Sequence, residues 1–150
     1  MKLFVAKQVI YGCESRGDAK SPYMTRYAFP RIGPVRMCLH VFHRSDADDL
    51  HDHPWPFISV ILWRGYREVT PWRRAYSGPP SDGGPEFRRC KRVWPGMILF
   101  RPAAHIHRVE LIDGKRAISL VFMGRRIREW GFFTRQGWKL WTKYFAENGC

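Results

Sequence analysis

The chain has 150 residues, of which 45% are hydrophobic and 26% charged, and its formal net charge is +13. This length allows one domain, residues 1–150, with one sizeable core, and the composition excludes a disordered protein. No apolar run approaches the roughly 18 residues that a membrane-spanning helix needs, so we expect no membrane partner.

The N-terminal residues 1–34 predict an arm laid over the rest of the domain. Residues 11–34 are rich in glycine, proline and polar side chains, and Tyr23–Phe29 is a candidate edge strand. The arm precedes a core that we place at about residues 35–124.

Short strands separated by turn residues dominate this core. The expected strands are Val35–Phe42, Phe57–Trp63, Tyr66–Thr70, Met97–Phe100, His105–Leu111 and Ala117–Met123. Asp113-Gly114 is a strong signal for a hairpin between the last two. The pattern predicts an all-β sandwich or barrel.

Residues 125–150 form the C-terminal segment, which predicts a short helix or turn. Trp138, Trp141 and Phe145 follow one another at i, i+3 and i+7, which is one face of a helix of about three turns. An aromatic stripe of this kind is typical of a lid on a core.

Most of the positive charge lies in the second half of the chain. Residues 61–150 carry 18 basic and 7 acidic side chains, and the longest basic cluster is Arg88–Arg92, where a strand should begin after the loop 77–85. No nucleic-acid readout motif accompanies it. We therefore expect a solvated face that allows weak, non-specific polyanion binding at most.

The four cysteines lie far apart and form no Cys-x-x-Cys motif. This spacing argues against a zinc ribbon or a dense disulfide framework and predicts a reduced, cytoplasmic protein.

Two His-x-His pairs are the main candidate for a functional site. In an extended segment, residues i and i+2 point to the same side, so His51 and His53 converge, as do His105 and His107. Pro54 disfavours a helix at the first pair. Imidazole is a common ligand of Zn, Fe, Ni and Cu, so the pattern predicts one divalent metal ion.

These motifs resemble those of the cupins. His51-Asp52-His53 and Gly65 match the first cupin motif, and Gly96, Pro102 and His107 match the second. Phe57 or Ile58 stands where the ligand glutamate of the family would be. The resemblance implies a double-stranded β-helix, or jelly-roll barrel, with a three-histidine metal site formed by His51, His53 and His107.

A tighter resemblance links the chain to a cupin family of bacteria and their phages. It rests on His51-Asp52-His53-Pro54-Trp55, Trp130-Gly131-Phe132 and Gly137-Trp138, and it covers most of the chain. This resemblance implies no particular reaction, but it makes a phage accessory role one of the alternatives.

Strand parity predicts the surroundings of the metal. Counted from His107, the side chains of His105, Val109 and Leu111 point inward, whereas Arg108 and Glu110 point outward. His105 is then a spare ligand or a substrate contact, and Asp52 fixes the local turn or a ligand's second nitrogen.

Further candidates for the site lie on other segments. His40 either lines the cavity or is a buried, satisfied histidine. Parity leaves the direction of Arg101 open, and a surface position is the simpler expectation. The possible additional site residues are Arg101 and Arg26 as anion contacts and Trp55 and Tyr66 as walls of the mouth.

The predicted function is a metal-binding cupin that acts as a non-haem Fe(II)-dependent oxygenase on a small anionic molecule, with Zn, Ni or Mn as other possible ions. The alternatives are a non-catalytic cupin, such as a small-ligand or metal sensor or a phage accessory protein, and a basic nucleic-acid-associated protein. We also allow for a homodimer.

Overall fold

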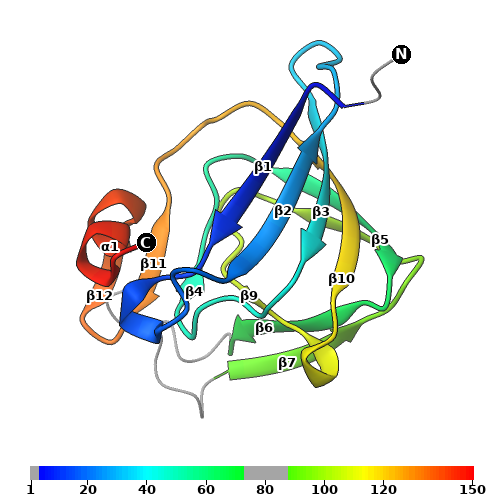
Figure 1. Cartoon of the computed structure of the whole chain (residues 1–150). Coiled ribbons are helices and arrows are strands. Elements are labelled where there is room, and N and C mark those ends of the chain that lie inside the picture. The colour runs from blue at the N-terminus through cyan, green and yellow to red at the C-terminus, as the bar shows by residue number, and fades with distance from the viewer. Residues whose placement is uncertain (1–3, 73–87) are drawn as a thin grey trace.

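The computed structural model describes residues 4–72 and 88–150, and these form a barrel of antiparallel strands with one short helix (Figure 1). The loop expected at 77–85 lies outside the described residues. The strands are β1 (Ala6–Tyr11), β2 (Pro22–Ala28), β3 (Arg36–Phe42), β4 (Leu50–His51), β5 (Phe57–Trp63), β6 (Tyr66–Pro71), β7 (Arg88–Val93), β8 (Ile98–Arg101), β9 (Arg108–Glu110), β10 (Ala117–Met123), β11 (Gly131–Thr134) and β12 (Gly137–Leu140). The helix is α1 (Trp141–Asn148), and short 3-10 turns occur at Glu14–Arg16 (η1) and Ile112–Gly114 (η3).

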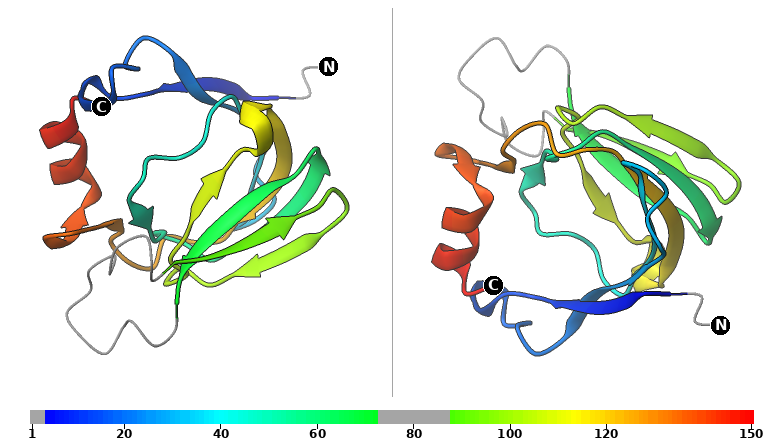
Figure 2. Two further views of the ribbon diagram at one scale, coloured as in Figure 1. Left: turned by 90° about the horizontal axis from the view of Figure 1, so that it is seen from below. Right: turned by 90° about the horizontal axis from the view of Figure 1, so that it is seen from above.

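Two layers of strands enclose the interior. The first is a six-stranded sheet with the order β1-β2-β3-β10-β5-β8. The second consists of β7-β6-β9 and β12-β11-β4, which are joined by an antiparallel bridge between His51 and His107. Figure 2 shows the strands arranged around a common interior, with α1 at one side. This arrangement confirms the predicted jelly roll.

Alternation along the strands separates core from surface. In β10, every second residue from Ala117 to Met123 is buried. The largest apolar cluster combines nine buried residues from both layers: Met24, Phe42, Ile61, Tyr66, Val93, Leu99, Val109, Leu111 and Ala117. It fills one end of the barrel and leaves the other end for the histidines.

The turn at Asp113-Gly114 is present, but the hairpin prediction is wrong. Both residues have positive φ, 52° and 64°. The flanking strands nevertheless separate, because β9 pairs with β6 whereas β10 pairs with β3 and β5. The turn therefore carries the chain from one layer to the other.

The N-terminal segment contributes more to the sheet than an arm would. β1 and β2 pair with each other, and β2 also pairs with β3. The strand expected at the sheet edge is thus an internal strand, since β1 covers its outer side. Sequence patterning did not indicate β1.

The C-terminal helix is shorter than predicted. α1 covers Trp141–Asn148, and Trp138 lies in β12, which forms a hairpin with β11. A Cβ atom at Gly131 would lie 2.0 Å from the carbonyl oxygen of Lys139, so glycine allows these two strands to approach. Trp138 therefore belongs to the β11–β12 hairpin and not to the helix in which the aromatic spacing placed it.

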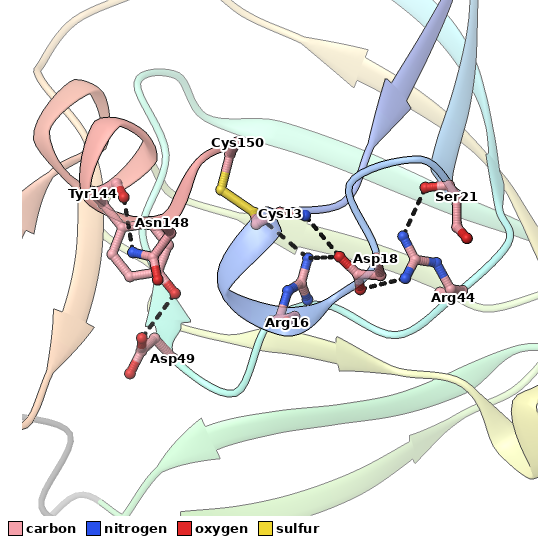
Figure 3. Close-up of a disulfide and its surroundings, with 9 residues drawn as sticks. All are labelled: Cys13, Arg16, Asp18, Ser21, Arg44, Asp49, Tyr144, Asn148 and Cys150. Carbon is pink, nitrogen blue, oxygen red and sulfur yellow. Dashed lines mark hydrogen bonds and ion pairs between the residues drawn. A yellow bond between two sulfur atoms is a disulfide. The ribbon is translucent and has the colours of Figure 1, made fainter.

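A disulfide between Cys13 and Cys150 joins the N-terminal part of the chain to its C-terminal end (Figure 3). The Glu14 N–H donates to the carbonyl of Gly149 at 3.1 Å beside it. Asp18 accepts the Cys13 N–H at 2.6 Å and forms an ion pair with Arg44. Because disulfides are rare in a reducing cytoplasm, the cysteines no longer support the cytoplasmic expectation.

Among the described residues, no helix has the length and apolar character that crossing a membrane requires.

Candidate metal centre

Two of the predicted ligands face each other across the bridge that joins the halves of the second layer. The His51 N–H donates to the His107 carbonyl at 2.9 Å, and the His107 N–H donates to the His51 carbonyl at 3.0 Å. Directly opposed residues of an antiparallel pair project their side chains to the same face. The two imidazole rings accordingly lie 5.1 Å apart, measured between centroids.

His53 completes a triangle. Its backbone N–H donates to the Ala103 carbonyl at 3.0 Å, and its ring lies 5.1 Å from that of His51 and 4.9 Å from that of His107. One nitrogen from each of the three rings lies within 4.8 Å of the others. The Nδ1 atom of His53 is buried and has no hydrogen-bond partner among the described residues. A buried nitrogen without a hydrogen-bond partner, on one of three neighbouring imidazoles, fits a metal ligand.

Burial keeps the imidazoles of His51 and His53 neutral. It lowers the pKa of His51 to about 4, against a smaller opposing effect of Asp46, and it holds the pKa of His53 well below its usual value. The neutral form offers the lone pair that a metal ion needs. The donor set therefore fits a divalent metal ion.

Glu68 orients one member of the triangle. Its Oε1 atom lies 2.8 Å from Nδ1 of His107 and 2.9 Å from Nε2 of His105, and Arg101 donates to both of its carboxylate oxygens at 2.9 and 2.5 Å. Burial alone would raise the pKa of Glu68, but the hydrogen bonds from His105, His107 and Arg101 outweigh burial and hold this pKa far below its usual value. An ionised Glu68 requires a proton on Nδ1 of His107, which leaves Nε2 free to bind a metal ion.

Glu68, His105 and His107 form a second group with metal-binding geometry. Its oxygen-to-nitrogen distances of 2.8 and 2.9 Å are ordinary hydrogen-bond lengths. Two ligands of one ion with bonds of about 2.1 Å lie about 3.0 to 3.4 Å apart. The hydrogen-bonding role therefore fits Glu68 better than the ligand role.

Aromatic side chains cover the histidine triangle. The ring of Phe57 lies 4.6 Å from that of His53, and the ring of Phe132 lies 5.7 Å from that of His51. Tyr144 of α1 stacks on Phe132 at 3.8 Å. The C-terminal hairpin and helix thus cover the site through Phe132 and Tyr144, whereas the predicted stripe of Trp138, Trp141 and Phe145 was expected to be a lid on the core.

The structure brings Arg101 and His105 to the centre and places other predicted residues elsewhere. Arg101 is not a surface residue, because its side chain is 18% exposed and bound to Glu68. Tyr66 lies in the large apolar cluster and does not wall a mouth. Trp55 is partly buried against a smaller cluster of Ala28, Cys38, Phe57, Val121 and Met123.

His40 and Arg26 form a pair of their own inside the first sheet. They are direct neighbours across β2 and β3, and Nε of Arg26 donates to Nε2 of His40 at 3.1 Å. Burial and, to a smaller extent, the neighbouring Arg26 charge together lower the pKa of His40 to about 3. His40 is thus a buried, hydrogen-bonded histidine, which was one of the two expectations for it.

Strand parity gave the right directions at the second motif, although β9 begins only at Arg108. Val109 and Leu111 are buried, and Arg108 and Glu110 pair with each other at 2.8 Å. Asp52 accepts the Gly131 N–H at 2.8 Å and pairs with Arg128 at 3.0 Å, so it fastens its segment to the start of β11, whereas it was expected to fix a local turn or a ligand's second nitrogen.

Glu68 is the residue that the sequence interpretation missed. The sequence did contain a signal for it. Tyr66 and Glu68 are two residues apart on one strand, so a Tyr66 side chain that points into the barrel places the Glu68 side chain there as well. A glutamate at such a position needs buried donors, and His105 and Arg101 were already candidates for the interior.

No protein-family profile matches the sequence, and no curated protein is similar to it in sequence. Among solved structures, a cupin-2 domain protein from Rhodospirillum rubrum is 12% identical, with a TM-score of 0.55 over 82% of this chain and 72% of that one. The DMSP lyase DddQ from Ruegeria pomeroyi DSS-3 is 16% identical, with a TM-score of 0.54 over 86% and 63%. The polyketide cyclase RemF from Streptomyces resistomycificus is 15% identical, with a TM-score of 0.50 over 68% and 65%. These similarities establish the cupin fold.

Proposed function

We propose that the chain is a metal-dependent cupin that holds one divalent ion with His51, His53 and His107. The observation that carries this proposal is the triangle of three imidazoles whose nitrogens lie within 4.8 Å of one another, in which Nδ1 of His53 has no partner among residues 4–72 and 88–150. The orientation of His107 by Glu68 supports the same set of ligands.

The reaction that we propose is oxygenation of a small anionic molecule with Fe(II) in the site. The ion would supply the binding and activation of dioxygen that non-haem iron sites provide. Three neutral ligands leave its 2+ charge uncompensated, and this favours an anionic substrate. Glu68 holds His107 in place, and Phe57 and Phe132 exclude water from the ligands.

The proposed anion contacts differ from those expected. Arg101 forms an ion pair with Glu68, so its guanidinium group is not available to a substrate carboxylate. Arg26 shares one hydrogen bond with neutral His40, and no described carboxylate pairs with it. Of the two arginines, Arg26 therefore retains the charge that an anionic substrate could use.

The covering of the site supports a second candidate, a non-catalytic cupin with a zinc or nickel ion. The side chains of His107 and His51 are only 7% and 16% exposed, and aromatic rings contact the triangle. A sensing or structural ion needs no room for a substrate. The expected homodimer stays a prediction.

Metal content tests the ligand set. We expect one divalent ion per chain by inductively coupled plasma mass spectrometry of the purified protein. His53 belongs only to the first group and His105 only to the second, so His53→Ala and His107→Ala should each abolish stoichiometric metal, whereas His105→Ala should weaken binding less. His43→Ala is the control, because His43 bonds to Thr25 outside both groups. Loss of metal in His105→Ala with retention in His53→Ala would assign the ion to the Glu68 group.

Oxygen uptake tests the reaction. Anaerobic protein is loaded with Fe(II), mixed with a panel of thiols and small acids, and then exposed to oxygen. Substrate-dependent oxygen consumption that His53→Ala abolishes would support the oxygenase. The absence of uptake across the panel, together with zinc in the native preparation, would favour the non-catalytic cupin.

A further inference from the structure

A basic cavity lies outside the histidine centre, where the β2–β3 connection meets the chain after β10. Its volume is about 590 Å³, and its lining consists of Arg31, Gly33, Pro34, Arg36, Trp55, Met123, Gly124, Arg125 and Arg126. Four of these side chains are guanidinium groups, and none is acidic. This volume lies within the range of about 300 to 1,000 Å³ that is usual for small-molecule sites.

Backbone hydrogen bonds fix both walls of the cavity. On one side, Ile32 and Val35 exchange N–H···O bonds of 3.2 and 3.1 Å around Gly33, whose φ is +57°. This short antiparallel bridge sets Arg31 and Arg36 on either side of a tight turn. Arg36 is also the direct partner of Met123 in the β3–β10 ladder.

The other wall contains Trp55 and the segment after β10. The Gly124 N–H donates to the Pro56 carbonyl at 2.9 Å, and the Ile127 N–H donates to the Pro54 carbonyl at 2.8 Å. These bonds hold Arg125 and Arg126 beside Trp55. The indole packs against a buried cluster that includes Met123, so the aromatic wall is anchored in the core.

The positive charge of the cavity is largely uncompensated. Arg126 pairs with Glu129 at 2.7 Å. The side chains of Arg31, Arg36 and Arg125 form no hydrogen bond or ion pair with any residue that the structure describes. Unpaired guanidinium groups in a concave site bind phosphate oxygens well, because their planar donor fork matches two oxygens at once.

We propose that this cavity binds a nucleotide, with the phosphates on Arg31, Arg36 and Arg125 and the base against Trp55. The arginines would bind a polyanionic group of the ligand, and the indole of Trp55 would stack on an aromatic group. A nucleoside triphosphate carries both in one molecule. The site requires no metal ion and is independent of the histidine triangle.

The Arg88–Arg92 cluster on β7 provides a matched contrast. Arg89 and Arg92 are exposed on a sheet edge, and Arg92 lies over the ring of Trp94 at 3.9 Å. Neither residue lines the basic cavity. Removing two arginines from the cavity or two from β7 changes the net charge of the protein by the same amount. A difference in ligand affinity between the two double variants would therefore reflect a local binding site and not the overall positive charge.

The experiment is isothermal titration calorimetry of the full chain with ATP at physiological ionic strength. We expect 1:1 binding that Arg36→Gln/Arg125→Gln weakens by about tenfold or more. Arg89→Gln/Arg92→Gln should change the affinity by less than about twofold, since exposed distant charges are screened. His53→Ala should leave ATP binding intact, which excludes chelation of ATP at the histidine centre. Equal losses in the two arginine pairs, or no binding of ATP, would overturn the proposal.

Two further probes test the aromatic part. ATP should bind more tightly than inorganic triphosphate, and Trp55→Leu should remove this difference while Trp55→Phe retains it. Thermal melts of both variants confirm that the core under Trp55 is intact. Equal affinity for triphosphate and ATP would reduce the site to a phosphate site. Binding of a single-stranded oligonucleotide without binding of ATP would assign the cavity to nucleic acid, and either outcome would contradict the nucleotide assignment.

Discussion

The two ends of the barrel use the same strands for different purposes, and β5 shows the change within a few residues. Its inward side chains are Phe57, Ser59 and Ile61. Phe57 contacts the ring of His53, whereas Ile61 lies in the large apolar cluster. The apolar end needs close packing to exclude water. The histidine end tolerates buried nitrogens because Glu68 accepts hydrogen bonds from His105 and His107 and a bound ion can bind the nitrogens of the triangle.

This contrast indicates that stability and metal binding can be changed separately. The apolar end should determine the free energy of unfolding and leave the ligands in place. The histidine end should determine metal affinity at a smaller cost in stability. Variants at each end, compared in both measurements, test the separation.

Ile61→Ala should have the largest effect on stability. The side chain is 1% exposed at the centre of the apolar cluster, and its truncation leaves a cavity. We expect a loss of about 2 to 5 kcal/mol in the free energy of unfolding, measured by urea denaturation. Metal content per folded chain should not change. Loss of metal without loss of stability would show that the two ends are not separable.

Removal of the Cys13–Cys150 disulfide should have a comparable but smaller effect. The bond fastens the end of the segment that covers the histidines, and it closes a loop with a sequence separation of 137 residues. We expect Cys13→Ser/Cys150→Ser to lower the free energy of unfolding by about 2 to 4 kcal/mol.

The regions in which hydrogen exchange increases show whether the disulfide stabilises the C-terminal segment or the whole domain. Hydrogen exchange should increase in α1 and β12 more than in β5 and β10, because the latter strands lie in the six-stranded sheet. Cys90→Ser is the control, since Cys90 is a free, exposed cysteine. Uniform acceleration across the barrel would contradict the assignment of the disulfide to the cover of the histidine end.

Glu68→Gln tests the histidine end alone. A neutral amide cannot balance Arg101 and holds the Nδ1 proton of His107 less firmly, so metal affinity should fall by about 10- to 100-fold. Competition with a chromophoric chelator measures this change. Glu110→Gln is the matched control, because Glu110 also pairs with two arginines but on the outer side of β9. An unchanged affinity in Glu68→Gln would show that Glu68 does not orient the ligand.

The sequence predicted the parts of the fold whose pattern is local. β5 and β10 have the predicted bounds, because a continuous or alternating apolar run identifies a strand without knowledge of its partner. The hairpin at Asp113-Gly114 failed, since the turn residues report local φ values and not which strand each neighbour pairs with. β1 was missed because its residues are mostly exposed at a sheet edge.

The site shows the same limit. Strand parity and spacing predicted the convergence of His51 with His53. Their meeting with His107 depended on the cupin resemblance, and in the structure it depends on a bridge between residues 56 positions apart. Arg101 and Glu68 could not be paired from sequence, because each has ordinary surface chemistry until β8 and β6 bring both inward.

The pH dependence of stability tests the buried pair of His40 and Arg26 in the first sheet, which belongs neither to the apolar cluster nor to the histidine triangle. Nε2 of His40 accepts a hydrogen bond from Arg26, so protonation would break this bond and place two buried cations together. Burial, with Arg26, lowers the pKa of His40 from 6.5 to about 3 in the folded state. Between these two pH values the unfolded state binds the extra proton, so stability should fall as the pH falls below about 6.5.

The expected effect is the smallest of the four. At pH 5.5 an unfolded histidine with a pKa of about 6.5 accounts for a loss of about 1.4 kcal/mol relative to high pH. His40→Gln keeps an acceptor for Arg26 and removes the titration, so its free energy of unfolding should depend less on pH between 7 and 5.5 than that of the wild type. The other buried histidines titrate in both proteins, and the difference between the two urea-denaturation profiles therefore isolates His40. Parallel profiles would show that His40 is not held neutral by its burial beside Arg26.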